Sequence, residues 1–263
     1  MYDFTYQRPA SLEDAASALA AGEDATLLAG GHTLIPTLKQ RLAQPSDLID
    51  LADVPGLSGI SKQGDQIVIG AMTTHGEVAA SSDVQSAIPA LAALAEMIGD
   101  PQVRTRGTIG GSVANNDPAA DYPAALVGLG ATVTTNKASH SADEFFTGMF
   151  ETALSDGEII TSVAFPIPKR AGYQKFPNPA SRYALVGVFV AETSGGVRVA
   201  VTGAGPCVFR VAEMETALGG SFSADAIKDI KVGDGDLNSD IHASAEYRAH
   251  LIGVMAGRAV AAA

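Results

Sequence analysis

The chain contains a single cysteine, Cys207, and no tryptophan. One thiol cannot form an internal disulfide, a zinc site built from several cysteines or the ligand set of an iron–sulfur cluster. This cysteine usage predicts a reducing, cytoplasmic environment. It also means that any iron–sulfur carrier working with this chain must lie on another chain.

Basic clusters and long apolar runs are also missing. Lys and Arg number 17 against 29 Asp and Glu, which gives a net charge of -12 with no basic block. Nucleic-acid binding through phosphate neutralisation is therefore not expected. No run of about 20 apolar residues predicts a transmembrane segment. The stretch Met1–Phe4 lacks the basic and apolar pattern of a signal peptide.

What is present favours a folded protein rich in turns. Hydrophobic residues make up 46% of the chain and charged residues 17%, a balance that excludes a disordered or coiled-coil chain. The length of 263 residues allows one large domain or two modest ones. The 28 glycines predict many turns and close backbone approaches.

Residues 1–55 predict a small βαβ unit behind an N-terminal helix. Ser11 starts that helix as a capping residue. Ala25–Ala29 is a short apolar strand, Pro36 opens the next helix, and Leu48–Leu51 is a second strand.

Residues 56–168 show a different pattern. Leu57–Ile60 and Gln66–Ile69 predict a hairpin, and Ile88–Ile98 an apolar helix. Pro123–Leu129 predicts a short helix that is followed by the strand Ala131–Thr134.

A boundary is predicted at Pro168, because Pro166 and Pro168 stop any regular element. The expected domains are therefore 1–168, with subdomains of about 1–55 and 56–168, and 169–263. The second domain is expected to hold two strands and two helices, Tyr183–Thr193, Val197–Thr202, Val211–Leu218 and Ser244–Val260.

The first candidate site is a strand that runs into paired glycines and then into a helix. It comprises Leu28, Ala29, Gly30, Gly31, His32, Thr33 and Leu34. Glycines let the backbone approach a phosphate, and the N–H groups at a helix start bind anions. Thr33 adds a hydroxyl, and His32 is expected to act through its backbone N–H. An ordinary strand-to-helix turn would show the same pattern.

A second glycine pair follows later in the chain, and its backbone is likewise predicted to bind an anion. It comprises Thr108, Ile109, Gly110, Gly111 and Ser112. Asn116 and Asp121 lie downstream, and the Asp121 carboxylate could accept hydrogen bonds from ribose hydroxyls or simply cap a surface helix. A dinucleotide has two phosphates, so two such loops indicate more than either one alone. By contrast, Gly203–Val208 lacks the third glycine of a Rossmann turn and is interpreted as a plain turn.

The two loops, in this order, resemble the FAD-binding subunit of the molybdenum hydroxylases. That family includes the medium subunit of carbon monoxide dehydrogenase and the flavin portion of xanthine dehydrogenase. The stretches at Phe4–Pro9, Leu48–Leu51 and Asp240–Arg248 extend the resemblance over nearly the whole chain. Thr33 stands where the family usually has serine, and Ser112 where asparagine or aspartate also occurs.

The resemblance implies an α+β protein. Two subdomains would clasp FAD in a fold of the vanillyl-alcohol-oxidase (PCMH) type, and a small C-terminal α+β domain would add an antiparallel sheet and helices. Ile98 and Ile160 would be apolar walls of the cleft, or plain core residues. Lys175 would lie near the flavin ring, and Asp121 near the adenosine end. Tyr183 would stack on the ring, or pack as a strand residue. No acid or base is assigned.

The implied function is electron transfer within a complex. A large subunit with the molybdenum cofactor and a small subunit with [2Fe–2S] clusters would join this chain as a heterotrimer that dimerises. Electrons would leave through FAD to NAD+, a quinone or oxygen. The substrate stays open, because its pocket would lie on the large subunit. Two alternatives are a stand-alone flavin oxidoreductase and a non-catalytic nucleotide-binding assembly protein.

Overall fold

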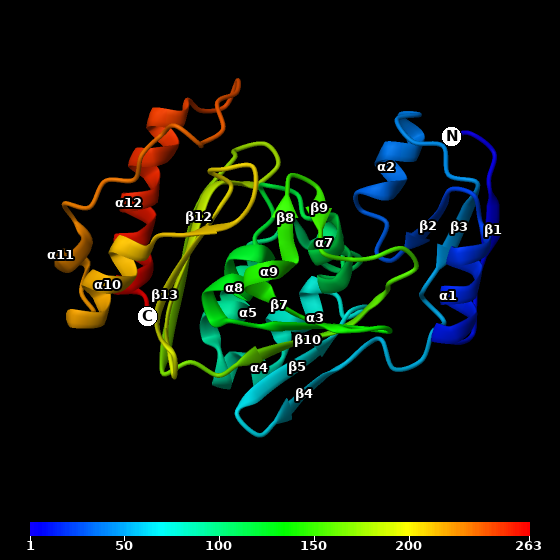
Figure 1. Cartoon of the computed structure of the whole chain (residues 1–263), viewed down its shortest axis with the longest axis horizontal. Helices are drawn as coiled ribbons and strands as arrows, with labels where there is room; N and C mark the ends of the chain where they lie inside the picture. Colours follow the sequence, from blue (N-terminus) through cyan, green and yellow to red (C-terminus); the bar gives the residue numbers. More distant parts are fainter.

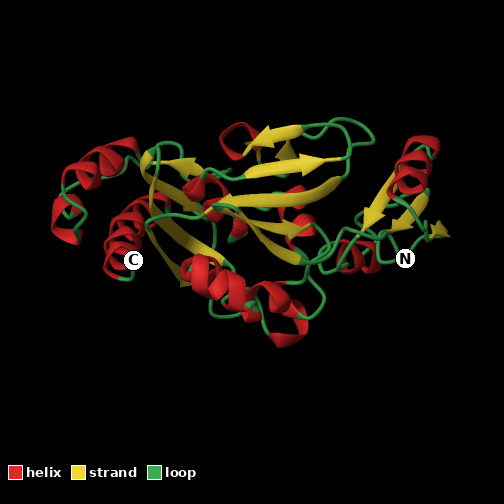
Figure 2. Ribbon diagram, turned by 90° about the horizontal axis from the view of Figure 1, so that it is seen from below, coloured by secondary structure: helices red, strands yellow, loops and turns green.

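The computed structural model describes residues 1–263 and arranges them as three parts in a row (Figure 1). The N-terminal part is a small lobe joined to the rest by loops, as Figure 2 also shows. Its elements are β1 (Thr5–Gln7), α1 (Leu12–Ala21), β2 (Ala25–Leu28), α2 (Leu34–Lys39) and β3 (Asp47–Asp50). The three strands form a parallel sheet in the order β1-β3-β2, and this confirms the predicted βαβ unit.

The helix starts in this lobe follow local chemistry. Ser11 accepts a hydrogen bond from the N–H of Asp14 and so caps α1 as predicted. The prediction that Pro36 opens α2 was two residues late, because α2 begins at Leu34. Pro36 is tolerated there because the N–H groups of a helix's first turn have no intrahelical partner.

The central part packs helices against an antiparallel sheet of order β4-β5-β10-β6-β7. The strands of this sheet are β4 (Ile60–Gln63), β5 (Gln66–Gly70), β6 (Thr132–Thr135), β7 (Ser139–Ser141) and β10 (Ile160–Pro166). A separate antiparallel pair is formed by β8 (Phe146–Gly148) and β9 (Glu151–Thr152). Its helices are α3 (His75–Ala80), α4 (Ser82–Ala87), α5 (Pro89–Glu96), α6 (Pro101–Arg104), α7 (Ile109–Asn115), α8 (Tyr122–Leu129) and α9 (Ala142–Phe145).

Two predictions for the central part need correction. The expected helix Ile88–Ile98 is shorter, because α5 begins at Pro89 and ends at Glu96. Ile88 lies outside the helical region, with φ -139° and ψ 70°, since a residue before proline avoids that region. The first hairpin strand runs over Ile60–Gln63 rather than Leu57–Ile60, and Leu57 is instead buried in the N-terminal hydrophobic cluster.

The C-terminal part is a four-stranded antiparallel sheet, β11-β12-β13-β14, covered by helices. Its elements are β11 (Arg170–Pro177), β12 (Ala184–Thr193), β13 (Gly196–Thr202), β14 (Phe209–Arg210), α10 (Ala212–Gly220), α11 (Ala224–Ile227) and α12 (Ala245–Ala261). The two strands and two helices predicted here are confirmed within three residues at each end. Strands β10 and β11, which flank Pro168, were not predicted.

The protein has three hydrophobic clusters. One lies in the N-terminal lobe and one under α12. The largest joins the central helices and sheet to Tyr173 and Phe189 of the C-terminal sheet, so apolar packing continues across Pro168. The division into 1–168 and 169–263 stays a prediction. None of the helices is long and apolar enough to cross a membrane.

Candidate FAD cleft between two glycine loops

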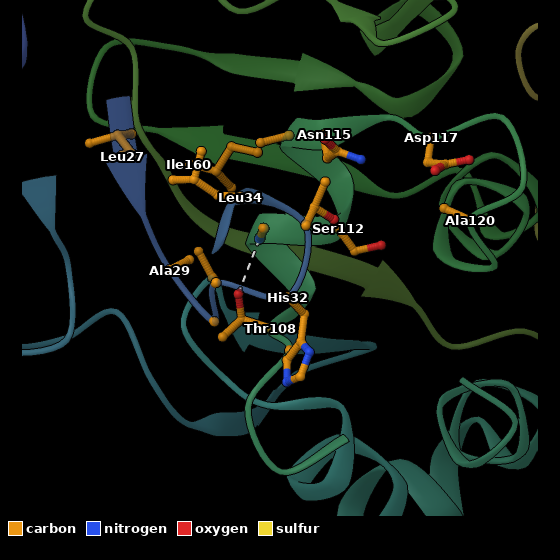
Figure 3. A pocket seen from close by; sticks show the side chains of 18 of the residues that line it. Leu27, Ala29, His32, Leu34, Thr108, Ser112, Asn115, Asp117, Ala120 and Ile160 are labelled. Carbon is orange, nitrogen blue, oxygen red and sulfur yellow. Dashed lines mark hydrogen bonds between the residues drawn. The ribbon is translucent and has the colours of Figure 1, made fainter. Parts of the chain in front are cut away.

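Two loops far apart in sequence meet between the N-terminal lobe and the central part. The first glycine loop, residues 29–34, connects β2 to α2, and the second glycine loop, residues 107–112, leads into α7. A Cβ atom on Gly30 would lie 2.1 Å from the carbonyl oxygen of Arg106. A Cβ atom on Gly111 would lie 3.5 Å from the Cβ atom of Ala29. The loops therefore touch through their backbones, and Figure 3 shows Ala29 and Thr108 near each other.

Both loops require glycine, either because the backbone is left-handed or because a neighbouring atom lies too close for a Cβ atom. Gly31 has φ +75°, in the left-handed region that favours glycine. A Cβ atom on Gly110 would lie 2.5 Å from the Cβ atom of Ala71, which no real Cβ contact allows. Gly107 leaves room for the ring of His75, whose Nε2 would lie 2.6 Å from an added Cβ atom. Each glycine thus permits a close approach that a side chain would block.

The first glycine loop holds N–H groups with no acceptor in the chain. Backbone hydrogen bonds resume at Ile35, whose N–H donates to the carbonyl of Gly31 at 3.0 Å. The N–H groups of residues 30–33 donate to no backbone or side-chain acceptor. Thr33, the residue before α2, makes no side-chain capping bond. Consecutive free N–H groups at a helix start form a site for an anion such as a phosphate.

In the second glycine loop, by contrast, the N–H groups of residues 109–111 have acceptors within the chain. The N–H of Ile109 donates to the carbonyl of Thr73 at 3.0 Å, and that of Gly110 to the carbonyl of Ala71 at 2.8 Å. Thr108 caps α7 by accepting the N–H of Gly111 at 3.2 Å, the bond drawn dashed in Figure 3. The sequence predicted two equal cradles. Instead, the second loop offers the hydroxyls of Thr108 and Ser112 and a surface for close approach.

Both loops line one cleft with a volume of about 660 Å³, within the range of cofactor sites. The apolar walls include Leu27, Leu51, Ile98, Leu154 and Ile160. Fourteen of the eighteen site residues expected from the sequence line it, namely Ala29, Gly30, Gly31, His32, Thr33, Leu34, Ile98, Thr108, Gly110, Gly111, Ser112, Asp121, Ile160 and Tyr183.

Four expected site residues do not line the cleft: Leu28, Ile109, Asn116 and Lys175. Ile109 is fully buried in the central core. The amide of Asn116 donates to the carbonyls of Gly148 at 2.8 Å and Glu151 at 2.7 Å, so it holds a neighbouring hairpin. The spacing of a motif shows that these residues are near the site, but it cannot show which way they point.

Asp121, Lys175 and Tyr173 form a buried polar cluster at one end of the cleft. The Lys175 ammonium lies 2.9 Å from Asp121 Oδ1, with both side chains under 5% exposed. The Tyr173 hydroxyl donates to Asp121 at 2.6 Å, and Lys175 also donates to the carbonyl of Met97 at 2.9 Å. Burial raises the pKa of Asp121, while the Lys175 charge opposes that shift. Lys175 therefore acts on the cleft through Asp121.

Tyr183 lies at the rim of the cleft, just before β12, and is 49% exposed. Its neighbour Arg182 also lines the cleft and donates to the carbonyl of Gly99 at 3.3 Å, although its backbone is left-handed with φ +63°. Burial and the nearby carboxylates of Asp117 and Asp121 raise the pKa of Tyr183. Tyr183 thus offers an aromatic face at the mouth rather than packing inside the core.

His75 is a lining residue that the sequence did not single out. It begins α3, is 5% exposed, and has an Nδ1 atom without a hydrogen-bond partner. Burial, together with His32 and Arg104, lowers its pKa to about 4, so the ring is neutral at pH 7. Other lining residues, such as Met72 and Ile159, come from segments that carry no motif. Only the folded topology brings them together.

The comparisons with known proteins agree with this geometry. Residues 2–168 match the family described as the FAD binding domain in molybdopterin dehydrogenase. The chain is 38% identical to the nicotine 6-hydroxylase medium subunit of Paenarthrobacter nicotinovorans, over 94% of this chain and 92% of that protein. It is 34% identical to the carbon monoxide dehydrogenase medium chain of Hydrogenophaga pseudoflava, over 99% of this chain and 96% of that one.

The fold comparison gives the same answer. A chain in the solved structure of carbon monoxide dehydrogenase from Hydrogenophaga pseudoflava superposes with a TM-score of 0.90 at 36% identity. The match covers 100% of this chain and 97% of that one. Two facing glycine loops along one cleft, in a chain whose residues 2–168 match this family, define a flavin-nucleotide-binding protein. The chain belongs to the FAD-binding subunits of the molybdenum hydroxylases, and it is an electron-transferring oxidoreductase subunit.

Proposed function

We propose that the cleft holds FAD with its pyrophosphate against the first glycine loop, and that the chain relays electrons between partner subunits and an external acceptor. The observation that carries the proposal is the row of free N–H groups at residues 30–33 inside the cleft. An anion supplies the acceptors that these donors lack. The second glycine loop closes the cradle from the other side.

The remaining walls suit the rest of the cofactor. Ile98 and Ile160 provide apolar surface for ring faces. We place Asp121 at the same end of the cofactor as Tyr183, because it lies close enough to raise the pKa of that hydroxyl, and Lys175 and Tyr173 hold its carboxylate in place. Tyr183 lies over the flavin ring at the mouth.

Electrons must come from outside this chain. FAD, when bound, accepts electrons one at a time and releases them as a pair. The single cysteine cannot ligate a cluster. Relatives named as medium chains and subunits support membership of a complex with a large and a small partner. In it, [2Fe–2S] clusters of the small subunit deliver electrons here, and the large subunit holds the molybdenum cofactor.

The proposal extends to the stoichiometry of the complex and to its electron acceptor. The complex is a dimer of heterotrimers, and the acceptor is NAD+, a quinone or oxygen. The substrate is selected by the large subunit, which fits the finding that relatives named for nicotine and for carbon monoxide both resemble this chain. A cytoplasmic location stays a prediction, supported by the single free cysteine.

The test is anaerobic reduction of the flavin in the three-subunit complex and in the isolated, FAD-loaded chain. Substrate of the large subunit should bleach the flavin band only in the complex. A matched complex that lacks iron should leave the flavin oxidised. Bleaching of the isolated chain by the same substrate would contradict the relay and favour a stand-alone flavin oxidoreductase.

A further inference from the structure

His75 lies beside the second glycine loop without being part of it. It is the first residue of α3, and its backbone N–H donates to the carbonyl of Gly107 at 2.9 Å. Thr74 and Glu77 form a reciprocal capping box around this helix start. The backbone that carries the His75 ring is therefore fixed by bonds within the chain.

The ring of His75 lies in the wall of the cleft where the two loops meet. A Cβ atom on Gly107 would lie 2.6 Å from His75 Nε2, and both residues line the cleft. His32 of the first glycine loop is close enough for its charge to help lower the pKa of His75. The imidazole thus adjoins both loops.

Neither ring nitrogen of His75 has a partner within the chain. Nδ1 is shielded from solvent and has no hydrogen-bond partner. The groups beside Nε2 bond elsewhere, since the N–H of Gly107 donates to the carbonyl of Val103 at 2.7 Å. The ring centroid of Tyr122 lies 5.4 Å from that of His75, but its hydroxyl is also unbonded and does not serve the imidazole. The ring is therefore buried with its hydrogen-bonding capacity unused.

The burial of Nδ1 decides where the single proton of the neutral ring lies. Burial, together with the charges of His32 and Arg104, lowers the pKa of His75 to about 4, so at pH 7 one nitrogen carries a proton and the other a lone pair. A buried N–H group without an acceptor is rarer in proteins than a buried acceptor without a donor. The proton therefore lies on Nε2, beside Gly107 and the cleft.

The second glycine loop has no backbone donor to spare for an anion. The N–H groups of residues 109–111 all have acceptors within the chain, whereas those of residues 30–33 in the first loop have none. A phosphate held from both sides needs a side-chain donor on the side of the second loop. The Nε2–H group of His75 is such a donor, and a neutral ring offers it without taking up a proton.

We propose that His75 Nε2–H donates a hydrogen bond to the pyrophosphate of FAD and so supplies the donor that the second glycine loop lacks. This rests on the proposed function, in which the pyrophosphate lies against the first glycine loop. The glycine at position 107 then has a second purpose, because it leaves room for the imidazole at the phosphate site.

The test compares three variants of the flavin-free chain, His75→Gln, His75→Asn and His75→Leu. The side-chain amide nitrogen of glutamine reaches the position of Nε2, whereas that of asparagine reaches only the position of Nδ1. His75→Gln should therefore keep its affinity for FAD. In His75→Asn and His75→Leu the Kd for FAD should rise at least about tenfold, as expected for a lost hydrogen bond to a charged group.

Two further ligands locate the contact on the cofactor. ADP carries the pyrophosphate without the flavin, so its Kd should follow the same order among the variants. Riboflavin has no phosphate, and its Kd should not change. His250→Leu is the control, because it removes an exposed imidazole on α12 that stacks on Tyr247, and it should leave all three affinities unchanged.

The proposal is overturned if His75→Leu binds FAD like the wild type, or if riboflavin loses as much affinity as FAD. It is also overturned if His75→Gln binds FAD as weakly as His75→Asn, a comparison that holds even where His75→Leu fails to fold. A wild-type chain that takes up no FAD would instead contradict the proposed function itself.

Discussion

The two glycine loops look alike in sequence and differ in their hydrogen bonds. In the first loop, the N–H groups of residues 30–33 donate to no group of the chain. In the second, the N–H groups of Ile109, Gly110 and Gly111 all have acceptors within the chain. The first loop therefore keeps donors available for an anion, and we propose that the second is the surface that closes on it.

The cause of the difference lies at the helix starts. Thr108 is extended and places its hydroxyl on the N–H of Gly111, so α7 is capped from within. Thr33 is helical and makes no such bond, so α2 begins with open donors. A hydroxyl residue beside paired glycines can thus satisfy a helix start or leave it to a ligand. The backbone angle of Thr108 accounts for the bond from Gly111, whereas the carbonyls of Thr73 and Ala71 satisfy the N–H groups of Ile109 and Gly110.

The largest expected effect comes from filling the space between the loops with Gly111→Leu. The Cβ atom alone would lie 3.0 Å from Thr108 Oγ1, and the branched side chain would occupy the space toward Ala29. We expect purified protein without detectable flavin absorbance, although it keeps its far-ultraviolet circular dichroism. Full FAD occupancy in this variant would show that the second loop does not bound the phosphate site.

Gly30→Ala tests the contact between the loops with a single methyl group. That methyl would lie 2.1 Å from the carbonyl oxygen of Arg106, so the loops must separate. The Kd for FAD should rise at least about a hundredfold, or about 2.7 kcal/mol. Gly219→Ala is the matched control, because its Cβ atom would meet nothing within 4 Å. Equal FAD affinity of the two variants would contradict the account.

The neutral His75 ring beside the second loop predicts a pH dependence of stability. Its pKa falls from 6.5 in the unfolded chain to about 4 in the fold, so the unfolded chain binds the proton more readily. Stability should therefore be complete above pH 6.5 and decrease on the order of 2–3 kcal/mol as pH falls to 4. Urea unfolding against pH measures this slope. His75→Leu should remove its part, and an unchanged slope would count against a buried neutral ring.

The smallest effect is expected from Thr108→Ala, which deletes the cap of α7. The free energy of unfolding should decrease by about 1 kcal/mol, as for other lost caps. The variant also frees the N–H of Gly111. If the second loop acted as an anion donor, FAD would bind more tightly to this variant. We expect no tighter binding, and Thr108→Ser should restore stability.

The sequence predicted much of the fold where patterns are local. The capping residue Ser11, the βαβ unit and the strand pair β12–β13 follow from capping chemistry, apolar runs and a glycine turn. Strands β10 and β11 escaped because prolines at 166 and 168 interrupt their pattern. Gly203, the left-handed glycine of the turn interpreted as plain, has φ +81° and lies outside the cleft.

The sequence predicted the motifs of the site but not the orientation of the side chains around them. Paired glycines mark where backbones approach closely, so both loops were found. The buried pairing of Lys175 with Asp121 depends on the Lys175 side chain of β11 reaching the residue that precedes α8, which no spacing reveals. The position of the His75 ring against Gly107 and the bonds of the buried Asn116 amide to the β8–β9 hairpin likewise depend on packing between distant segments. The identity of the cofactor was inferred from the resemblance to the family. The structure showed that the two loops differ in which N–H groups have acceptors.

The most direct test of the account is a titration of the flavin-free chain with FAD, FMN and riboflavin, followed by fluorescence quenching. FAD carries the pyrophosphate that we propose is bound by the open donors of the first loop, whereas FMN has one phosphate and riboflavin has none. We therefore predict that FAD binds at least about a hundredfold more tightly than FMN, and that riboflavin binds more weakly still. Equal affinity for FAD and FMN would contradict a pyrophosphate seated between the two glycine loops.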